Sequence, residues 1–157
     1  MKSFIALSLF FSTCVWAAEA SFDIKLSPSG SFTGRTSNVT GFARKSGTKV
    51  VAENIVVDLT AVKTGMSLRD KHTLDYLQAK TYPKAVLVKA VGEKGKGVGR
   101  IRIKDIEKDI RGTYKLEGQE LAAEFPLKLS DFKIEGIRYM GIGVKDDIVV
   151  KVRVPVK

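Results

Sequence analysis

One short segment gathers the residue types that a nucleophilic catalytic relay needs. His72 is the only histidine of the chain, and Ser67 and Asp70 precede it closely. Such a relay requires a base, a nucleophile and an orienting carboxylate within hydrogen-bonding distance of one another. Ser67 followed three residues later by Asp70 is, however, typical of a helix start, where both side chains cap the backbone. We therefore expect a protein that is not an enzyme, with His72 bonded to a loop carbonyl or carboxylate; His72 as a general base is the alternative.

Metal and cofactor chemistry are not expected either. Zinc and copper sites gather several His and Cys ligands, whereas this chain has one histidine and one cysteine, Cys14. The glycines of residues 95–99 lack the spacing of a phosphate-binding loop and indicate a hairpin turn. Three carboxylates follow one another at period two, which predicts a solvent-facing strand face rather than an acid-base pair: Asp105, Glu107 and Asp109.

The first twenty residues have the layout of a secretory signal peptide. Met1 and Lys2 give a positive start, residues 4–15 form an apolar run, and Ala-Glu-Ala at 18–20 offers a cleavage site after Ala20. A membrane anchor is the alternative, but the run is shorter than the about 20 residues that span a bilayer as a helix. Cys14 lies in this segment, so the mature chain has no thiol, which suits an oxidising compartment. We predict a signal peptide over residues 1–20 and one domain over residues 21–157.

The chain is basic, with 27 Lys and Arg against 17 Asp and Glu and a formal net charge of +10. A basic exported protein could meet nucleic acid, anionic lipid headgroups or acidic polymers. The charges are spread along the chain, and the aromatic residues mostly fall on apolar positions instead of alternating with basic ones. We therefore expect a soluble surface with a positive bias and no nucleic-acid partner. An anionic membrane surface and a homodimer stay open.

Period-two alternation dominates residues 21–157, and this pattern is typical of strands with one buried and one wet face. The clearest run is 148–156, with others at 99–103, 109–116 and 121–129 and less regular ones nearer the N-terminus. Residues 67–80 lack alternation and are rich in helix formers, and Pro83 prevents continuation. Closure removes the unpaired edges of such a sheet, so we predict an all-β, eight-stranded antiparallel barrel with one short helix near a mouth.

The apolar positions of these runs define the expected barrel interior. At eight strands, side chains either just fill a barrel or leave room for one small ligand, and composition does not decide between the two. If a cavity exists, its walls and its ligand are expected to be apolar. The candidate lining residues are Ile24, Phe32, Phe42, Leu59, Met66, Leu74, Leu77, Val88, Ile101, Ile103, Tyr114, Leu116, Phe125, Leu127, Phe132, Val150 and Val152.

One segment is specific enough to indicate a family. Thr64-Gly65, Arg69-Asp70, His72 and Tyr82-Pro83, in that order and spacing, resemble the signature of the YceI-like polyisoprenoid-binding family. The resemblance continues over essentially all of residues 21–157. Departures occur at Asp105-Ile106-Glu107, where the family often has a Gly-Val-Thr turn, and at Val88 and Thr73. Further matching stretches are Phe22-Asp23-Ile24, Gly30-Ser31-Phe32, Asp131-Phe132-Lys133-Ile134 and Asp147 to Val152.

The resemblance implies a lipocalin-like barrel in the periplasm that binds a polyisoprenoid, a quinone or a similar amphipathic lipid and is not an enzyme. It also implies that Arg69, Asp70 and His72, with Tyr82-Pro83, position the helix near the barrel. We expect binding, transport or storage of such a lipid. The alternatives are a stress or adhesion protein that binds through a basic surface and has a filled barrel, and a lipid-acting enzyme that uses His72.

Overall fold

The computed structural model describes residues 18–157, so most of the predicted signal peptide lies outside the described residues. Twelve strands and one α-helix, α1 (Ser67–Leu77), make up this part of the chain, together with two short 3-10 turns, η1 (Leu59–Ala61) and η2 (Leu129–Phe132). The strands are β1 (Glu19–Ser27), β2 (Ser31–Thr36), β3 (Val39–Thr40), β4 (Ala43–Ser46), β5 (Lys49–Asp58), β6 (Lys84–Glu93), β7 (Lys96–Ile103), β8 (Ile106–Glu117), β9 (Glu120–Lys128), β10 (Arg138–Tyr139), β11 (Ile142–Val144) and β12 (Asp147–Pro155).

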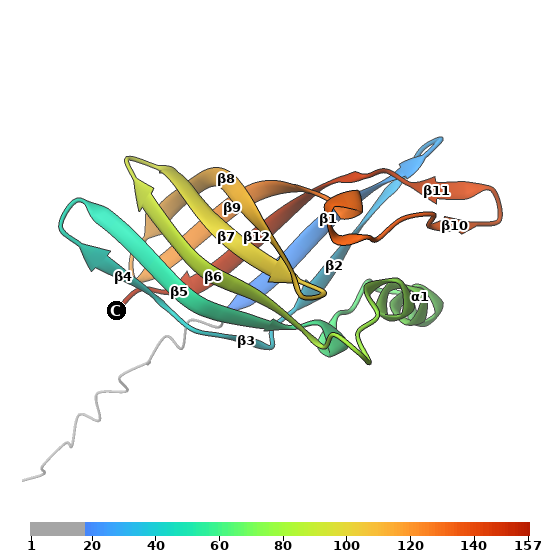
Figure 1. The fold of residues 1–157 in the computed structure, drawn as a ribbon, viewed down its shortest axis with the longest axis horizontal. Helices are drawn as coiled ribbons and strands as arrows, with labels where there is room; N and C mark the ends of the chain where they lie inside the picture. Colours follow the sequence, from blue (N-terminus) through green and yellow to red (C-terminus); the bar gives the residue numbers. More distant parts are fainter. Residues whose placement is uncertain (1–17) are drawn as a thin grey trace, which may run out of the picture.

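Eight long strands form one curled antiparallel sheet in the order β2-β1-β12-β9-β8-β7-β6-β5 (Figure 1). The predicted all-β, lipocalin-like barrel with a short helix is confirmed. The additional strands have two to four residues each, too few for an alternating pattern to be recognisable: β3 and β4 pair with β5, and β10 and β11 extend the sheet beyond β1. For this reason the sequence indicated eight strands.

The edges of the curled sheet are joined by backbone contacts in addition to the pairing of the long strands. Arg35 on β2 exchanges two backbone hydrogen bonds of 2.8 Å with Lys63, which follows η1. Ala43 on β4 bridges in parallel to Val156, and the N–H of Lys157 donates to the Ala43 carbonyl. Ala43 is fully buried there. These contacts satisfy part of each exposed edge and curl the sheet around an interior.

An irregularity in β5 and β6 changes which side chains face the interior. Between β6 and β7 the register shifts by one residue between Leu87 and Lys89, which leaves Val88 as the extra residue of a bulge. On the neighbouring β5, Asn54 has a positive φ of 52°. The inward positions therefore change parity along both strands, and an uninterrupted alternation no longer predicts the face of each residue.

The turn between β7 and β8 changes one prediction about charged residues. Lys104 and Asp105 both have positive φ values and form this turn, so Asp105 is not on a strand and the predicted row of three carboxylates is wrong. Glu107 and Asp109 do lie on β8, exposed, and Asp109 accepts a 3.0 Å hydrogen bond from Arg100 on β7. These two carboxylates form the solvent-facing strand surface that was predicted.

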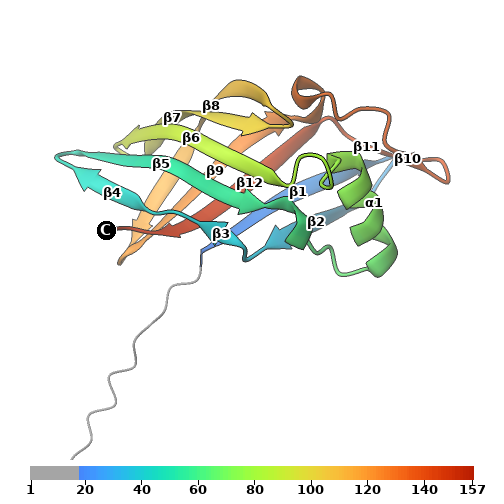
Figure 2. The same cartoon turned by 60° about the horizontal axis from the view of Figure 1, so that its bottom comes forward.

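The helix α1 lies at one end of the barrel, beside the β10–β11 hairpin, as both ribbon views show (Figures 1 and 2). It ends at Leu77, earlier than predicted, because Gln78 adopts the left-handed conformation that caps the helix. Leu74 and Leu77 pack against a small core cluster of Leu59, Val62, Ala79 and Ala85. Leu68, in the first turn of the helix, is exposed.

The N-terminal strand begins before the predicted cleavage point. Ala20 is buried on β1, where it pairs with Thr36 of β2 and Val152 of β12. Cleavage after Ala20 would therefore remove the first two residues of β1 from the sheet. Within residues 18–157, no helix has the length and apolar character needed to cross a membrane.

Candidate ligand-binding cavity

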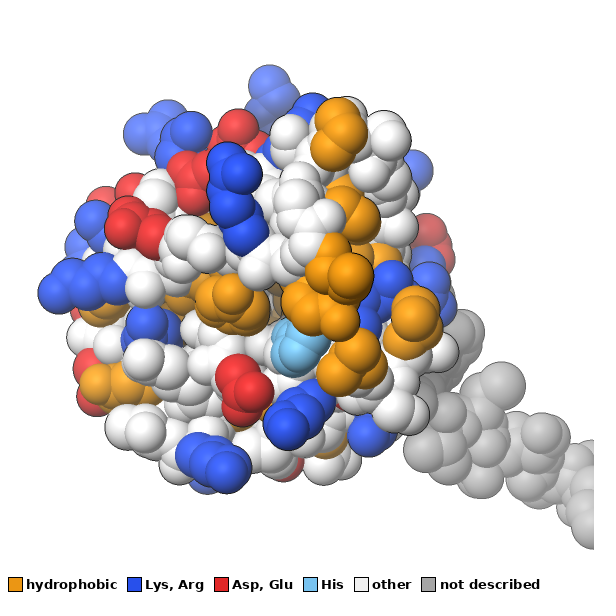
Figure 3. Space-filling view, turned by 90° about the vertical axis from the view of Figure 1, so that its right-hand side faces the viewer, with side chains coloured by type: hydrophobic (Ala, Val, Ile, Leu, Met, Phe, Trp, Pro, Cys, Tyr) orange, Lys and Arg blue, Asp and Glu red, His pale blue; other side chains and the backbone are white. Residues whose placement is uncertain are grey.

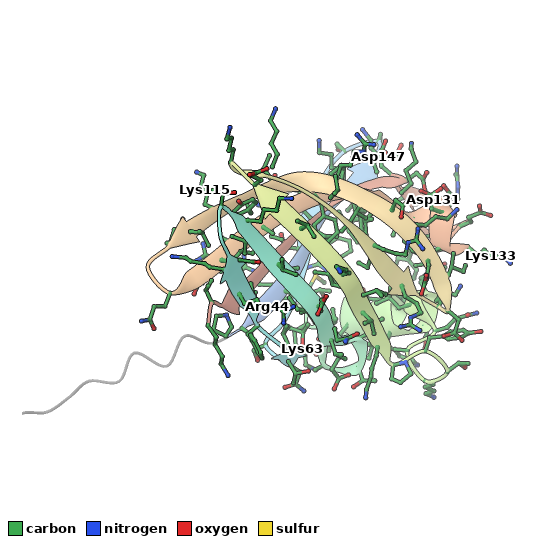
Figure 4. The ribbon with its side chains drawn as sticks, turned by 60° about the vertical axis from the view of Figure 1, so that its left-hand side comes forward. Arg44, Lys63, Lys115, Asp131, Lys133 and Asp147 are labelled. Carbon is green, nitrogen blue, oxygen red and sulfur yellow. The ribbon has the colours of Figure 1, made fainter. Side chains whose placement is uncertain are left out.

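The interior of the curled sheet contains a cavity of about 500 Å³. This volume falls within the roughly 300–1,000 Å³ that is typical of small-molecule sites. The walls come from nearly every long strand and from α1, and they consist almost entirely of apolar side chains. Charged side chains such as those of Lys115 and Asp147 lie on the outside of the barrel (Figure 4). The expectation of an apolar interior holds, and the hypothesis of a filled barrel is wrong.

The structure brings most of the predicted lining residues together around this cavity. Strands across the whole sheet contribute residues, because every second side chain of a strand faces the interior. The turn η1 and the helix α1 contribute further residues named below. The predicted residues that line the cavity are Ile24, Phe32, Leu59, Met66, Leu77, Ile101, Ile103, Tyr114, Phe125, Leu127, Phe132, Val150 and Val152.

Four predicted lining residues lie elsewhere: Phe42, Leu74, Val88 and Leu116. Val88 is the bulged residue of β6. The side chain of Leu74, on α1, packs against the small core cluster around Val62 instead of facing the cavity. Leu116 keeps the inward parity of β8 but lies at the exposed hairpin end, and Phe42 is exposed beside Lys157, whose Nζ is 4.6 Å from the ring centroid. A bulge, a helix packing surface and two strand ends account for these errors.

Small residues aligned across four strands provide much of the free space. Ala52 on β5 pairs with Ala90 on β6, which pairs with Gly99 on β7. A second row runs from Gly92 on β6 through Gly97 on β7 to Gly112 on β8, and every member of both rows lines the cavity. Each row removes side-chain volume from one level of the wall. These rows could not be predicted from the sequence, because only the strand register brings their members together.

Close packing makes two of the three glycines in the second row difficult to replace. The ring of Tyr114 occupies the space that a Cβ at Gly92 would need, and a Cβ at Gly112 would meet the carbonyl oxygen of Glu124. A Cβ at Gly97, by contrast, would have ordinary contacts, the nearest at 3.4 Å to the carbonyl oxygen of Val91. The second row is therefore tightly packed at both ends and open at its centre.

One end of the cavity is bordered by α1 and the β10–β11 hairpin. Four large apolar side chains that line the cavity are exposed here: Met66, Leu68, Tyr139 and Ile142. One other exposed side chain of this kind, Val98, lies on β7. We call the α1 end the mouth. Across it, the rings of His72 and Tyr139 lie 5.1 Å apart with a tilt of 53° between their planes.

The family-motif residues fasten the start of α1 to the segment before it. Asp70 Oδ1 accepts hydrogen bonds from both the backbone N–H and the hydroxyl of Thr64, each at 2.6 Å. Arg69 Nη2 donates a 2.6 Å hydrogen bond to the Thr64 carbonyl, and its guanidinium lies 4.5 Å from the ring centroid of Phe32. All three hydrogen-bonding groups of the buried Thr64 are thus engaged. We call this arrangement the Thr64 clamp.

The clamp replaces the capping arrangement predicted for Ser67. The residue at the N-cap is Met66, whose side chain makes no capping hydrogen bond, and Asp70 bonds to Thr64 instead of to Ser67. The side-chain hydrogen bond from Thr64, followed by its backbone hydrogen bond, lowers the pKa of the Asp70 carboxyl below its ordinary value of 3.8. Asp70 is therefore a charged structural acceptor, and the predicted capping role of Ser67 is wrong.

The polar residues at the mouth do not assemble a catalytic relay. Asp70 Oδ1 accepts its hydrogen bonds from Thr64, and the ring of His72 lies against the tilted ring of Tyr139. Across the described part of the chain, no three His, Cys, Asp or Glu side chains converge as metal ligands would. One polar atom at the mouth, Nε of Arg69, is buried without a hydrogen-bond partner.

Tyr82 and Pro83 lie at the far end of the helical segment and do not line the cavity. The N–H of Tyr82 donates to the carbonyl of Gln78, the residue that caps α1, at 2.8 Å. The Pro83 carbonyl accepts from the N–H of Leu59 at 2.8 Å, which joins the start of β6 to η1. The motif residues thus hold both ends of the helical segment against the barrel.

An antiparallel barrel around an apolar interior, with a helix at its mouth, defines a lipocalin-like protein. The chain matches the family model described as the YceI-like domain over residues 16–156, and it belongs to this family. No curated protein matches.

Two solved structures have a similar fold. BcnA of Burkholderia cenocepacia superposes with a TM-score of 0.66 at 17% identity, over 87% of this chain and 94% of that one. A polyisoprenoid binding domain from Saccharophagus degradans, implicated in plant cell wall breakdown, superposes with a TM-score of 0.59 at 15% identity, over 87% and 91%. At these identities the likeness shows the fold alone.

Proposed function

We propose that this protein binds a polyisoprenoid, or a similar long amphipathic lipid such as a quinone, in the barrel cavity. The observation that carries the proposal is the cavity itself, which is about 500 Å³ in volume, almost wholly apolar and bordered at its mouth by exposed apolar side chains. Membership of the YceI-like family and the polyisoprenoid-binding character of the Saccharophagus degradans domain support it.

An apolar wall is sufficient for this function, because each buried CH₂ group contributes roughly 0.8 kcal/mol. A five-carbon isoprene unit would therefore contribute about 4 kcal/mol before the loss of chain freedom is subtracted. Few polar groups are needed, and several of those in the wall gather near the mouth on α1 and β10, including Arg69, His72 and Tyr139. We propose that the polar end of the lipid lies at the mouth and the tail extends toward the two rows of small residues.

The proposed setting is the periplasm, where a protein with this cavity could store a lipid or carry it between membranes. This part of the proposal rests on the layout of residues 1–20. Mass spectrometry of the protein purified from the periplasmic fraction tests it, because cleavage gives a mature N-terminus near Ala20. An intact leader on protein recovered from the cytoplasm would contradict the setting without contradicting lipid binding.

Organic extraction of the purified protein followed by mass spectrometry tests the ligand. The expected result is a co-purifying isoprenoid, at a stoichiometry close to one for each chain. Delipidated protein is then offered a medium-length polyprenol or a quinone in detergent and separated from free lipid by gel filtration. The absence of bound isoprenoid in both steps would refute the proposal.

His72 lines the cavity, so a lipid-acting enzyme that uses this side chain is the second function to test. Replacement His72→Ala removes the only imidazole while leaving the Thr64 clamp in place. The binding function predicts that the extracted lipid is chemically unchanged and that H72A still takes up polyprenol. Conversion of the added lipid by the wild type, abolished in H72A, would establish the enzyme instead.

A further inference from the structure

Exposed apolar side chains concentrate at the mouth. Among residues 18–157, eight large hydrophobic side chains are exposed, and five of them lie on the segment that starts α1 or on the β10–β11 hairpin: Met66, Leu68, Tyr139, Met140 and Ile142. Met140 is the most exposed of all, at 84%, and it does not line the cavity. Figure 3 shows this face, with hydrophobic side chains gathered around its centre and Lys and Arg side chains beside them.

The same two segments are basic. Residues 63–71 and 136–145 contain five basic side chains, Lys63, Arg69, Lys71, Arg138 and Lys145, against the single acidic residue Asp70. The Asp70 carboxylate is held by the two hydrogen bonds from Thr64. The hairpin segment 136–145 has no acidic residue. Apolar side chains with cations beside them complement an anionic lipid surface, where acyl chains lie beneath negative headgroups.

We propose that the mouth docks on an anionic bilayer. Met140 and its apolar neighbours enter the acyl-chain boundary, and the exposed side chains of Lys71, Arg138 and Lys145 contact the headgroups. This inference rests on the proposed lipid-binding function and adds the partner from which the ligand is taken. The mouth lies between the two docking segments, so docking joins the cavity to the acyl layer. A lipid tail then moves between bilayer and barrel without crossing water, which avoids the cost of exposing its CH₂ groups to solvent.

Sedimentation with vesicles tests the docking surface, using phosphatidylcholine alone and phosphatidylcholine mixed with phosphatidylglycerol. The wild type is expected to bind the anionic vesicles more strongly, and added salt is expected to weaken that binding. Met140→Glu removes the most exposed apolar side chain and is expected to lower partitioning at least about tenfold. The matched control is Leu116→Glu, on an exposed leucine at the β8–β9 end that is absent from the cavity wall, with an expected change below about twofold.

A second pair of variants tests the charge. Lys145→Gln in the hairpin segment is expected to weaken binding to anionic vesicles about fivefold, and Lys115→Gln at the other end of the barrel less than about twofold. Figure 4 shows Lys115 and Lys133 at opposite ends of the molecule. Equal effects of the two lysine variants, or vesicle binding that ignores lipid charge, would overturn the proposal.

The arms separate docking from ligand binding. Met140→Glu is expected to keep wild-type uptake of polyprenol from detergent, because Met140 is outside the cavity wall, but to extract polyprenol from vesicles more slowly. Uptake from detergent without vesicle binding would refute docking and leave the proposed lipid-binding function intact. Vesicle binding without uptake would refute the lipid-binding function and leave docking of the mouth on the bilayer intact. A wild-type dimer that Met140→Glu converts to a monomer would show that the mouth contacts a second copy of the chain, and docking on a bilayer would be refuted.

Discussion

Filling the cavity from its wall is the most direct perturbation of the proposed binding. Ala123 on β9 lines the cavity and packs against the core cluster that contains Ala43 and Val50. Its neighbour Ala122, equally half-buried, does not line the cavity and pairs with Lys115 on β8. Ala43 belongs to β4, which lies at the end of the barrel opposite α1, so Ala123 lines that end of the cavity (Figure 1). The variants Ala123→Trp and Ala122→Trp therefore compare a filled interior with a modified exterior at adjacent positions.

The expected loss of affinity follows from the number of ligand carbons displaced. Tryptophan adds nine non-hydrogen atoms to alanine, and displacing as many tail carbons would cost about 7 kcal/mol at roughly 0.8 kcal/mol each. A flexible tail recovers part of this by shifting toward the mouth, so we expect a loss of about 3 kcal/mol, or at least a hundredfold weaker binding. Ala122→Trp is expected to bind within about twofold of the wild type, because it changes no contact with the ligand. Unfolding of the ligand-free Ala123→Trp protein should need no less denaturant than the wild type, because the indole enters open apolar space.

Polyprenol titration of delipidated protein measures the affinities, and the indole reports its own position. Trp16 is the only tryptophan and belongs to the predicted signal peptide, so each mature variant contains a single indole. Ala123→Trp should emit at shorter wavelength than Ala122→Trp, as a buried indole does. Wild-type affinity in Ala123→Trp together with that blue-shifted emission would refute the assignment of the lipid tail to this space.

Three further predictions concern the clamp and the wall. Thr64→Val, which removes the hydroxyl donor to Asp70, is expected to speed amide hydrogen exchange in the first turn of α1 by up to about tenfold, with exchange in β9 unchanged. Hydrogen bonds from Thr64 and Ser130 lower the pKa values of Asp70 and Asp146, respectively, in the folded protein. The two charged carboxylates therefore stabilise the fold fully above the ordinary pKa of 3.8, and this stabilisation is lost as the pH falls through their lower pKa values in the folded state. Thermal unfolding between pH 2 and 7 should therefore show a falling Tm below about pH 4, less steeply in Asp70→Asn. Gly112→Ala should cost about 1–3 kcal/mol in urea unfolding and Gly97→Ala much less, because the new Cβ would overlap a backbone carbonyl oxygen at position 112 but only touch one at ordinary contact distance at position 97.

The long strands and the helix could be predicted because each is encoded locally. On β12, Ile148 and Val154 are buried among residues whose alternation already separates apolar from charged positions. The helix was recognisable for the opposite reason, because residues 67–80 break that alternation. Local pattern also identified most of the cavity wall, since inward-facing positions on a regular strand recur at every second residue.

The remaining features depend on contacts between distant segments. Val88 was wrongly assigned to the cavity wall, because a bulge depends on how β6 pairs with β7 and the residue types of β6 alone do not indicate one. The two rows of small residues arise only when the hairpin turns fix the register of β5 to β8. Glycine in strands signals a close approach of side chain or backbone, so the density of Gly92, Gly97, Gly99 and Gly112 was a usable signal that became interpretable with the pairing.

The Thr64 clamp explains why the recognisable motif of this chain is polar although its proposed ligand site is apolar. No residue of α1 is buried, and Leu68 in its first turn is exposed, so little hydrophobic burial holds that end of the helix in place. The three hydrogen bonds to Thr64 and the contact of Arg69 with Phe32 do so instead. A helix fastened by hydrogen bonds at its start is free to expose Met66 and Leu68 beside the mouth, where burial against the barrel would have hidden them. The polar motif therefore shapes the entrance, and the apolar wall, which needs no motif, is the proposed site of the lipid.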